Sequence, residues 1–227
     1  MYINNRAAAL IFRLFTITGC GYGLASMSNI FGGGFTAQML VFYTTLSNIL
    51  VFGYLTASVV HTVMGIRLFG LRGVSTLLPG LKRAFVLMII ITALVYHIVL
   101  ASSDFIMSFD YGLHSLPDIL VHYFTPIMFM LDWLLFDKKG QVKRLDPLKW
   151  LILPGLYLIF AVIRAQVGPP IPMFGRMMRY PYPFLDVDYY GLGQVGINVL
   201  VLIAGFTFLG YVFYFIDKIL TFRNKKY

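Results

Sequence analysis

The chain has 227 residues, of which 59% are hydrophobic and 12% are charged, and its mean hydropathy is +0.80. A soluble domain of this size cannot bury so much apolar surface, so the composition excludes a soluble enzyme or binding domain and predicts an all-α, multi-spanning membrane protein. The formal net charge of +9 comes from basic clusters between apolar segments, which is typical of membrane orientation and argues against a nucleic-acid partner.

Six apolar segments are long enough to cross a hydrocarbon core as helices. A chain of this length accommodates one helical bundle, so we expect a single six-helix transmembrane domain over residues 1–227. The segment 167–188 is rich in Pro and aromatic residues and is predicted to lack regular structure. The predicted helices span residues 7–27, 37–61, 81–101, 117–136, 148–167 and 190–220.

The basic residues are distributed unevenly between the two sides of the predicted bundle. Fifteen of the 18 lie near the first helix, between the second and third helices, between the fourth and fifth, or at the C-terminal end. Arg164, Arg176 and Arg179 fall on the other side. Because cytoplasmic segments carry the excess of Lys and Arg, we expect a multi-pass protein of the plasma membrane with both termini in the cytoplasm.

The fourth predicted helix, 117–136, carries two ionisable side chains. His122 lies four residues after Asp118, so the two share a helix face. Ionisable groups inside a membrane helix are costly, and they normally face a partner, a cavity or water. Either this helix lines a polar pocket, or the pair is a structural hydrogen bond that attaches it to a neighbour.

Polar residues of other predicted helices lie at a similar depth. At a rise of about 1.5 Å per residue, Thr44 and His122 lie roughly 10 and 8 Å from the outer ends of their helices. This coincidence of depth predicts a polar pocket in the outer half of the membrane. The pocket is expected to contain Ser47, Asn48, His97, Asp118, Arg164 and Asn198 in addition to Thr44 and His122.

The residue types in this layer would support acyl transfer. A hydroxyl nucleophile, Thr44 or Ser47, needs a base such as His122, and Asp118 could orient the imidazole ring. Amide and guanidinium donors of Asn48, Asn198 and Arg164 could stabilise an oxyanion. The sequence has no GxSxG, HExxH, Walker or GxGxxG motif, and we predict no cofactor.

Three stretches carry a family resemblance: FYTTLSNILV, LVHYFTPIMFMLDWLLF and YPYPFLD. They resemble a bacterial family of six-helix integral membrane proteins. That family is more distantly similar to the eukaryotic androgen-induced membrane proteins, which hydrolyse fatty acid esters of hydroxy fatty acids. The resemblance implies a threonine nucleophile at Thr44 and a catalytic histidine at His122. Thr45 adjoins Thr44 and is the alternative position for the nucleophile.

Three functions remain open at this point. The favoured one is a membrane-embedded hydrolase of a lipid ester that uses Thr44 and His122, with Tyr182 and Phe184 of the outer loop as a lid. The second is a non-catalytic protein that binds or transports lipid in the same cavity. The third is a zinc hydrolase whose ligands are His97, His122, and His114 or an aspartate. All three predict a membrane lipid or a lipid-like molecule as the partner.

The predicted orientation can be tested with reporter fusions. Reporters placed after Phe31 or Pro172 should be found outside the cell, and reporters after Gly73 or Gln141 should be found in the cytoplasm, because the last two follow strongly basic segments. An external reporter at Gly73 or Gln141 would contradict the orientation.

Overall fold

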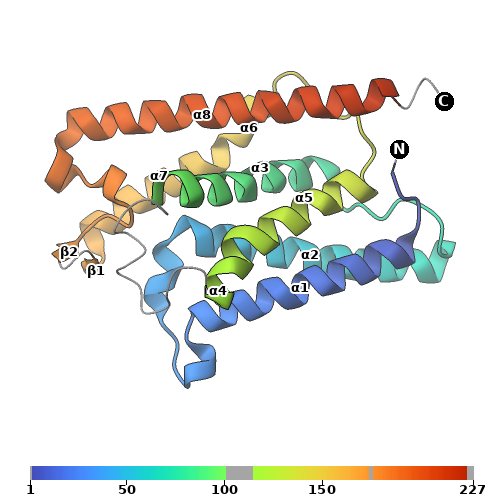
Figure 1. Ribbon diagram of the computed structural model, residues 1–227, viewed down its shortest axis with the longest axis horizontal. Coiled ribbons are helices and arrows are strands. Elements are labelled where there is room, and N and C mark those ends of the chain that lie inside the picture. The colour runs from blue at the N-terminus through green and yellow to red at the C-terminus, as the bar shows by residue number, and fades with distance from the viewer. Residues whose placement is uncertain (1, 101–114, 174–175, 224–227) are drawn as a thin grey trace.

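Six helices in the described part of the chain are long and apolar enough to cross a membrane. They come from a computed structural model that describes residues 2–100, 115–173 and 176–223 (Figure 1). The beginning of the first helix and the end of the last lie at the same end of the molecule (Figure 1). The prediction of a mostly helical chain with six helices of membrane-spanning length is confirmed. The spans are Arg6–Met27, Tyr43–Phe69, Pro79–Val99, Leu116–Phe136, Asp146–Val167 and Val187–Thr221.

Several spans consist of more than one helical piece. The third and fourth contain π-helical turns, named η3 and η5, and the fifth is divided near its start. In chain order the helices are α1 (Arg6–Met27), α2 (Tyr43–Phe69), α3 (Pro79–Val95), η3 (Tyr96–Leu100), α4 (Leu116–Ile119), η5 (Leu120–Phe124), α5 (Thr125–Phe136), α6 (Asp146–Trp150), α7 (Ile152–Val167) and α8 (Val187–Arg223). Short 3₁₀ turns span Ile30–Gly32 (η1), Ala37–Val41 (η2) and Pro183–Leu185 (η6).

The ends of the helices follow from local residue chemistry. The side chain of Asn5 accepts hydrogen bonds from the backbone N–H groups of Ala7 and Ala8, at 2.9 and 3.1 Å, and so caps α1. The second helix begins at Tyr43, later than predicted, because residues before it form a 3₁₀ turn and Phe42 has extended dihedral angles. At Gly191, near the start of α8, φ is +75°, a value that glycine adopts without steric cost and that kinks the helix.

The prediction that segment 167–188 lacks regular structure is wrong in part. Strands β1 (Ile171–Met173) and β2 (Arg176–Met178) form an antiparallel pair in which Ile171 lies opposite Met178. The side chains of Ile171, Met173 and Met178 are buried in the apolar core at the end opposite the termini. Burial of alternate residues explains how so short a hairpin is stabilised.

Two apolar cores fill the bundle, one near each end. The core at the end of the termini includes Phe129, Trp133 and Phe213. The opposite core includes Tyr96, Val121 and Tyr182. Helix α1 packs on α2 and α5, and α3 packs on both α2 and α5, whereas α8 contacts mainly α6, η6 and α3. The first four spans therefore form a close-packed block, with the last two spans at its side (Figure 1).

A buried ionic network crosses the close-packed block. Asp132 of α5 pairs with Arg13 of α1 at 2.9 Å and with Lys82 of α3, and all three side chains are 0% exposed. Lys82 also pairs with Asp137, and Arg13 donates to the hydroxyl of Thr62 on α2 at 2.8 Å. Two cations and two anions balance one another, so no net charge is buried in this network.

The sequence interpretation counts Arg13 and Lys82 among the basic residues on one side of the bundle. Neither side chain lies at the protein surface. Helix α3 begins at Pro79, three residues before Lys82, and both cations point into the protein toward Asp132. Their positive charge is therefore matched by aspartates inside the bundle.

Replacement of Asp132 tests the importance of this network. Asp132→Ala removes one of the two carboxylates that neutralise Arg13 and Lys82, so one positive charge remains buried without a partner. We therefore expect the free energy of unfolding to fall by about 3–5 kcal/mol. Denaturant unfolding in detergent micelles measures the change. Asp188→Ala is the matched control, because the ion pair of Asp188 with Arg179 is exposed and should contribute little. Equal effects of the two substitutions would contradict the role of the network.

Candidate functional site

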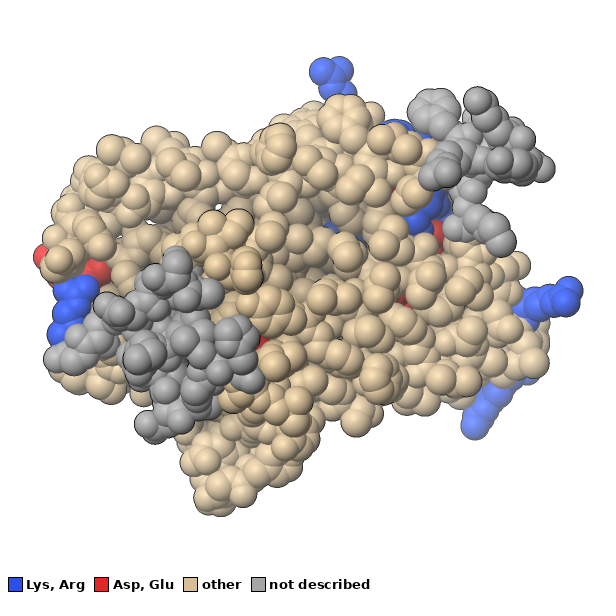
Figure 2. Space-filling model, in the orientation of Figure 1, with Lys and Arg blue, Asp and Glu red and all other residues tan. Residues whose placement is uncertain are grey.

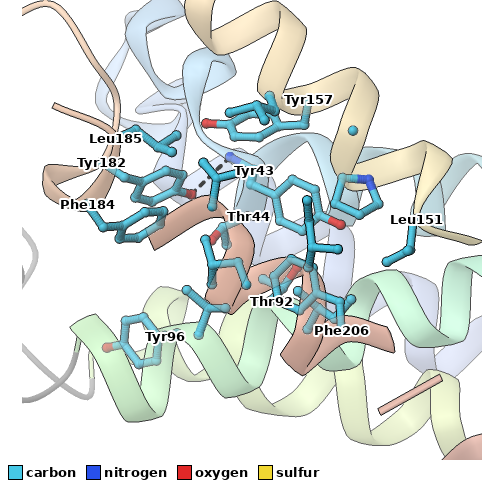
Figure 3. Close-up of a pocket in the computed structure, with 18 residues that line it drawn as sticks. Tyr43, Thr44, Thr92, Tyr96, Leu151, Tyr157, Tyr182, Phe184, Leu185 and Phe206 are labelled. Carbon is cyan, nitrogen blue, oxygen red and sulfur yellow. Dashed lines mark hydrogen bonds between the residues drawn. The ribbon is translucent and has the colours of Figure 1, made fainter. Parts of the chain in front are cut away.

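A mainly apolar cavity of about 200 Å³ lies between the close-packed block and the last two spans. Its walls come from α2, α3, α7 and α8, and from the loop that precedes α8 (Figure 3). Leu158 of α7, Val199 and Phe206 of α8, and Ile91 of α3 supply hydrocarbon surface. Enclosed apolar pockets with few polar groups are the usual binding sites for small hydrophobic molecules.

Two threonine hydroxyls lie in the wall of the cavity, on Thr44 of α2 and Thr92 of α3 (Figure 3). The hydroxyl of Thr92 hydrogen-bonds that of Ser47 at 2.9 Å, and Ser47 also donates to the carbonyl of Thr44 at 3.0 Å. Ser47 is therefore part of the contact between α2 and α3, a common use of hydroxyls between membrane helices. Thr44 lines this mainly apolar cavity, whereas the sequence interpretation expects it in a polar pocket.

Tyr182 connects the loop before α8 to the first residues of α2. Its hydroxyl accepts a hydrogen bond from the backbone N–H of Tyr43 at 3.0 Å and lies within hydrogen-bonding reach of the Thr44 side chain (Figure 3). Phe42 precedes the helix and has no polar side chain to cap it, so Tyr182 performs that role from far along the chain. Burial raises the pKa of Tyr182 to about 12, so the phenol is protonated at neutral pH.

His122 is held in one orientation by two neighbours. Its Nδ1 lies 2.9 Å from Oδ1 of Asp118, and the hydroxyl of Tyr96 donates to Oδ2 of the same carboxylate at 2.7 Å. The imidazole stacks on the ring of Tyr96 with centroids 3.6 Å apart and planes 13° apart. Among the described residues, none hydrogen-bonds Nε2 of His122. With Nδ1–H donated to Asp118, Nε2 carries a lone pair that can accept a proton.

The π-helical turn η5 that carries His122 has a cause in the sequence. Pro126 follows this turn by two residues and lacks the N–H that would continue the α-helical pattern. The carbonyl of Leu120 accepts the backbone N–H of Thr125, five residues later, and also the hydroxyl of Thr125 at 2.8 Å. Single π-helical turns inside α-helices occur frequently at functional sites.

Asn48 connects the helix of Thr44 to the helix of His122. Its Nδ2 donates to the carbonyl of Thr44 at 2.8 Å and to the carbonyl of Val121 at 3.1 Å. The Thr44 hydroxyl and the His122 ring make no direct hydrogen bond with each other, and His122 does not line the cavity. Tyr96, on which the imidazole stacks, lies at the edge of the cavity (Figure 3).

The remaining members of the predicted polar layer do not line the cavity. His97 is exposed, and its Nδ1 lies 3.0 Å from the hydroxyl of Tyr123. Arg164 donates to the carbonyls of Arg179 and Pro169 in the loop after α7. Asn198 donates to the carbonyl of Phe184 at 2.9 Å and so holds the loop against α8. A shared depth in the membrane is therefore not sufficient to bring these side chains together.

Several residues that line the cavity are not singled out by the sequence patterns. Thr92 and Tyr96 are four residues apart, and this spacing would have placed both on one face of α3. The sequence interpretation selects His97 from this region instead of Tyr96. Tyr43 and Tyr157 also line the cavity, with ring centroids 5.0 Å apart. No sequence pattern indicates that contact, because the two residues belong to distant helices.

The zinc alternative needs three or four converging ligands. Within residues 2–100, 115–173 and 176–223 there is no group of three or more His, Cys, Asp or Glu side chains that could hold a metal ion. His114, one of the ligands considered for this alternative, lies outside the described residues.

Comparison with known proteins gave no relative of this chain. No protein-family model, no curated protein and no solved structure matches the sequence or the fold significantly.

Proposed function

We propose that the protein is a membrane protein that binds one hydrocarbon chain of a membrane amphiphile in the cavity between α2, α3, α7 and α8. The observation that carries this proposal is the apolar lining of the cavity inside a bundle of six potential membrane spans. Transfer of hydrocarbon between a bilayer and such a cavity costs little desolvation, so dispersion contacts with the lining can decide binding.

The polar groups of the cavity suggest how the amphiphile is oriented. Thr44 and Tyr182 lie toward one side of the cavity, and Leu151 and Phe206 lie toward the other (Figure 3). We therefore place the polar part of the amphiphile near Thr44 and its hydrocarbon end near Leu151. Buried hydroxyls are stabilised by hydrogen-bonding partners, and an ester or carboxyl oxygen would supply one.

We also propose that the end with the termini faces the cytoplasm and that the protein lies in the plasma membrane. Most of the basic residues belong to the segments at that end, which supports this orientation. The polar side of the cavity, at Thr44, then lies in the outer half of the bilayer, because the loop with Tyr182 and Phe184 lies at the end of the bundle opposite the termini.

Gly155 offers a direct test of binding. It lies in the cavity wall, and a Cβ atom at this position would have no other atom within 4 Å. Gly155→Phe should therefore occupy cavity space and weaken binding of a fluorescent fatty acid by about tenfold, equivalent to about 1.4 kcal/mol. Titration of the purified protein in nanodiscs measures the change.

Gly53→Phe is the matched control for this test. Gly53 is also a helical glycine at which an added Cβ atom would meet no other atom within 4 Å, but it is exposed on α2 and does not line the cavity. Its substitution should leave the affinity unchanged. Equal affinities of the two variants and the wild type would contradict the assignment of the cavity as the binding site.

We further propose a reaction for this site, hydrolysis of a fatty acid ester of a hydroxy fatty acid or a similar lipid ester. The specific observation in its favour is the Asp118–His122 pair, which fixes the imidazole and leaves Nε2 without a described partner. An imidazole oriented by a carboxylate is the arrangement that general-base catalysis uses. The sequence resemblance points to the same histidine and to Thr44.

The proposed hydrolysis has two steps, transfer of the fatty acyl group to Thr44 and hydrolysis of the ester formed there. Oγ1 of Thr44 attacks the ester carbonyl carbon while Nε2 of His122 takes the hydroxyl proton. The proton then passes to the departing alkoxide, which leaves as the hydroxy fatty acid, and the fatty acyl group remains as an ester on Thr44. Water then gives a proton to the same Nε2 and attacks the carbonyl carbon of this ester, and the proton passes to Oγ1 of Thr44 as the free fatty acid leaves. Attack requires the Thr44 hydroxyl to turn from Tyr182 toward His122.

Substitution of the two residues tests the reaction. Thr44→Ala and His122→Ala should each lower the rate of ester hydrolysis at least about a hundredfold, because nucleophile or base is lost. Thr44→Ser should retain part of the activity, since the hydroxyl survives. A fluorophosphonate probe should label the wild-type protein at Thr44 and should not label the His122→Ala protein.

Thr45→Ala is the control, because Thr45 adjoins Thr44 but does not line the cavity. It should reduce activity only mildly. Labelling at Thr45 or Ser47 would contradict the assignment of the nucleophile. If Thr44→Ala binds fatty acid normally and the wild-type protein hydrolyses no ester, the binding proposal stands and the hydrolase proposal fails.

A further inference from the structure

The cavity reaches the surface of the protein on the side of α8. Ile203 lines the cavity and is nevertheless 44% exposed. This residue lies near the middle of the span Val187–Thr221, roughly 24 Å along the helix from Val187. An opening at this height faces the hydrocarbon part of a bilayer and not its aqueous surfaces.

Helices α7 and α8 are held together at their ends. At the end with the termini, α6 leads into α7 and packs against α8. At the other end, Arg164 of α7 donates to the carbonyl of Arg179 in the loop between the two helices, and Asn198 of α8 donates to the carbonyl of Phe184 in the same loop. Figure 2 shows gaps in the surface beside the row of side chains that belongs to α8. The space between α7 and α8 is thus bounded at both ends and open between them.

The rim of this opening is apolar and includes a small residue. Ile203 and Phe206 lie on the α8 side, and Leu158 and Gly155 lie on the α7 side. Gly155 leaves free space where a side chain would otherwise narrow the gap. A hydrocarbon chain can pass such a rim without exposing polar groups or breaking hydrogen bonds.

The loop before α8 closes the cavity toward the water at the end of the bundle opposite the termini. Tyr182 and Leu185 of the loop before α8 are buried, and the ring of Tyr182 stacks on that of Phe184 at 5.1 Å. The loop is attached to α2 through Tyr182 and to α8 through Asn198. Entry from water would need both attachments to break, whereas entry from the bilayer needs neither.

We infer that the cavity exchanges its ligand sideways with the bilayer, between α7 and α8, and that the occupant of this opening is the hydrocarbon chain of a membrane amphiphile. This inference rests on the proposed binding function. It limits the ligand to molecules that partition into the membrane, such as single-chain fatty acyl compounds, and it predicts that they need no transit through water.

Nitroxide accessibility tests the opening without any ligand. A spin label is attached at Leu202→Cys, a half-buried residue of the cavity wall, in a Cys20→Ala background. Molecular oxygen concentrates in hydrocarbon, whereas a nickel chelate that bears charged groups remains in water. In proteoliposomes we expect the nitroxide at this position to collide often with oxygen and rarely with the chelate. Collisions with the chelate would show an aqueous opening, and collisions with neither would show a closed cavity; each result overturns the inference.

Two further labels calibrate this measurement. A label at Val201→Cys reports a lipid-facing site, because Val201 is 65% exposed on α8 and does not line the cavity. A label at Lys138→Cys, an exposed residue of the loop after α5, reports contact with water. The label at Leu202 should match the label at Val201 in its accessibility to oxygen and to the chelate, and it should differ from the label at Lys138.

Exchange kinetics provide the second test. Ile203→Trp adds bulk at the opening and should slow association of a fluorescent fatty acid by about fivefold or more, because each entering hydrocarbon chain must pass this residue. Val201→Trp should leave the rates unchanged. Normal binding with rates that Ile203→Trp does not alter would overturn the lateral route and leave the binding proposal intact. Absence of any binding by the wild-type protein would overturn the binding proposal and, with it, the assignment of a ligand to this opening.

Discussion

The structure depends on the neutralisation of Asp132 in the interior of the bundle. This carboxylate binds Arg13 of α1 and Lys82 of α3, and all three groups are fully buried. A buried charge that loses its partner is strongly destabilising, so the three helices have one favourable arrangement relative to one another. Helix α5 continues backward into the turn that carries His122, and α1 packs beside the same turn. The ionic network therefore positions the candidate site from the far end of the bundle.

The cavity combines a closely packed wall with a loosely packed one. Thr44 and Thr92 belong to helices that are joined by hydroxyl contacts through Ser47, and Asn48 adds a bond to the turn before His122. On the other side, α7 and α8 present much of their surface to the surroundings. The polar groups of the cavity thus lie on helices that hydrogen bonds hold together. Much of its apolar lining lies on α7 and α8, which pack less closely against the rest of the protein.

Much of the fold and part of the site follow from local sequence patterns. Apolar segment length predicts the spans, and a spacing of four residues predicts the contact between Asp118 and His122. Depth along a helix does not give the direction of a side chain around it, so His97 is expected in the pocket but lies on the surface. The pairing of Asp132 with Arg13 joins residues 119 positions apart, and no local pattern encodes such a contact.

The bond between Tyr182 and the backbone of Tyr43 makes two distant segments of the chain interdependent. The first N–H groups of a helix have no partner within the helix, and here a phenol 139 residues away accepts one of them. Departure of the loop would expose that amide to solvent and loosen the first turn of α2, where Thr44 lies. Loop release and fraying of α2 are therefore one event, and the hydrogen-exchange rate of a single backbone amide reports on both.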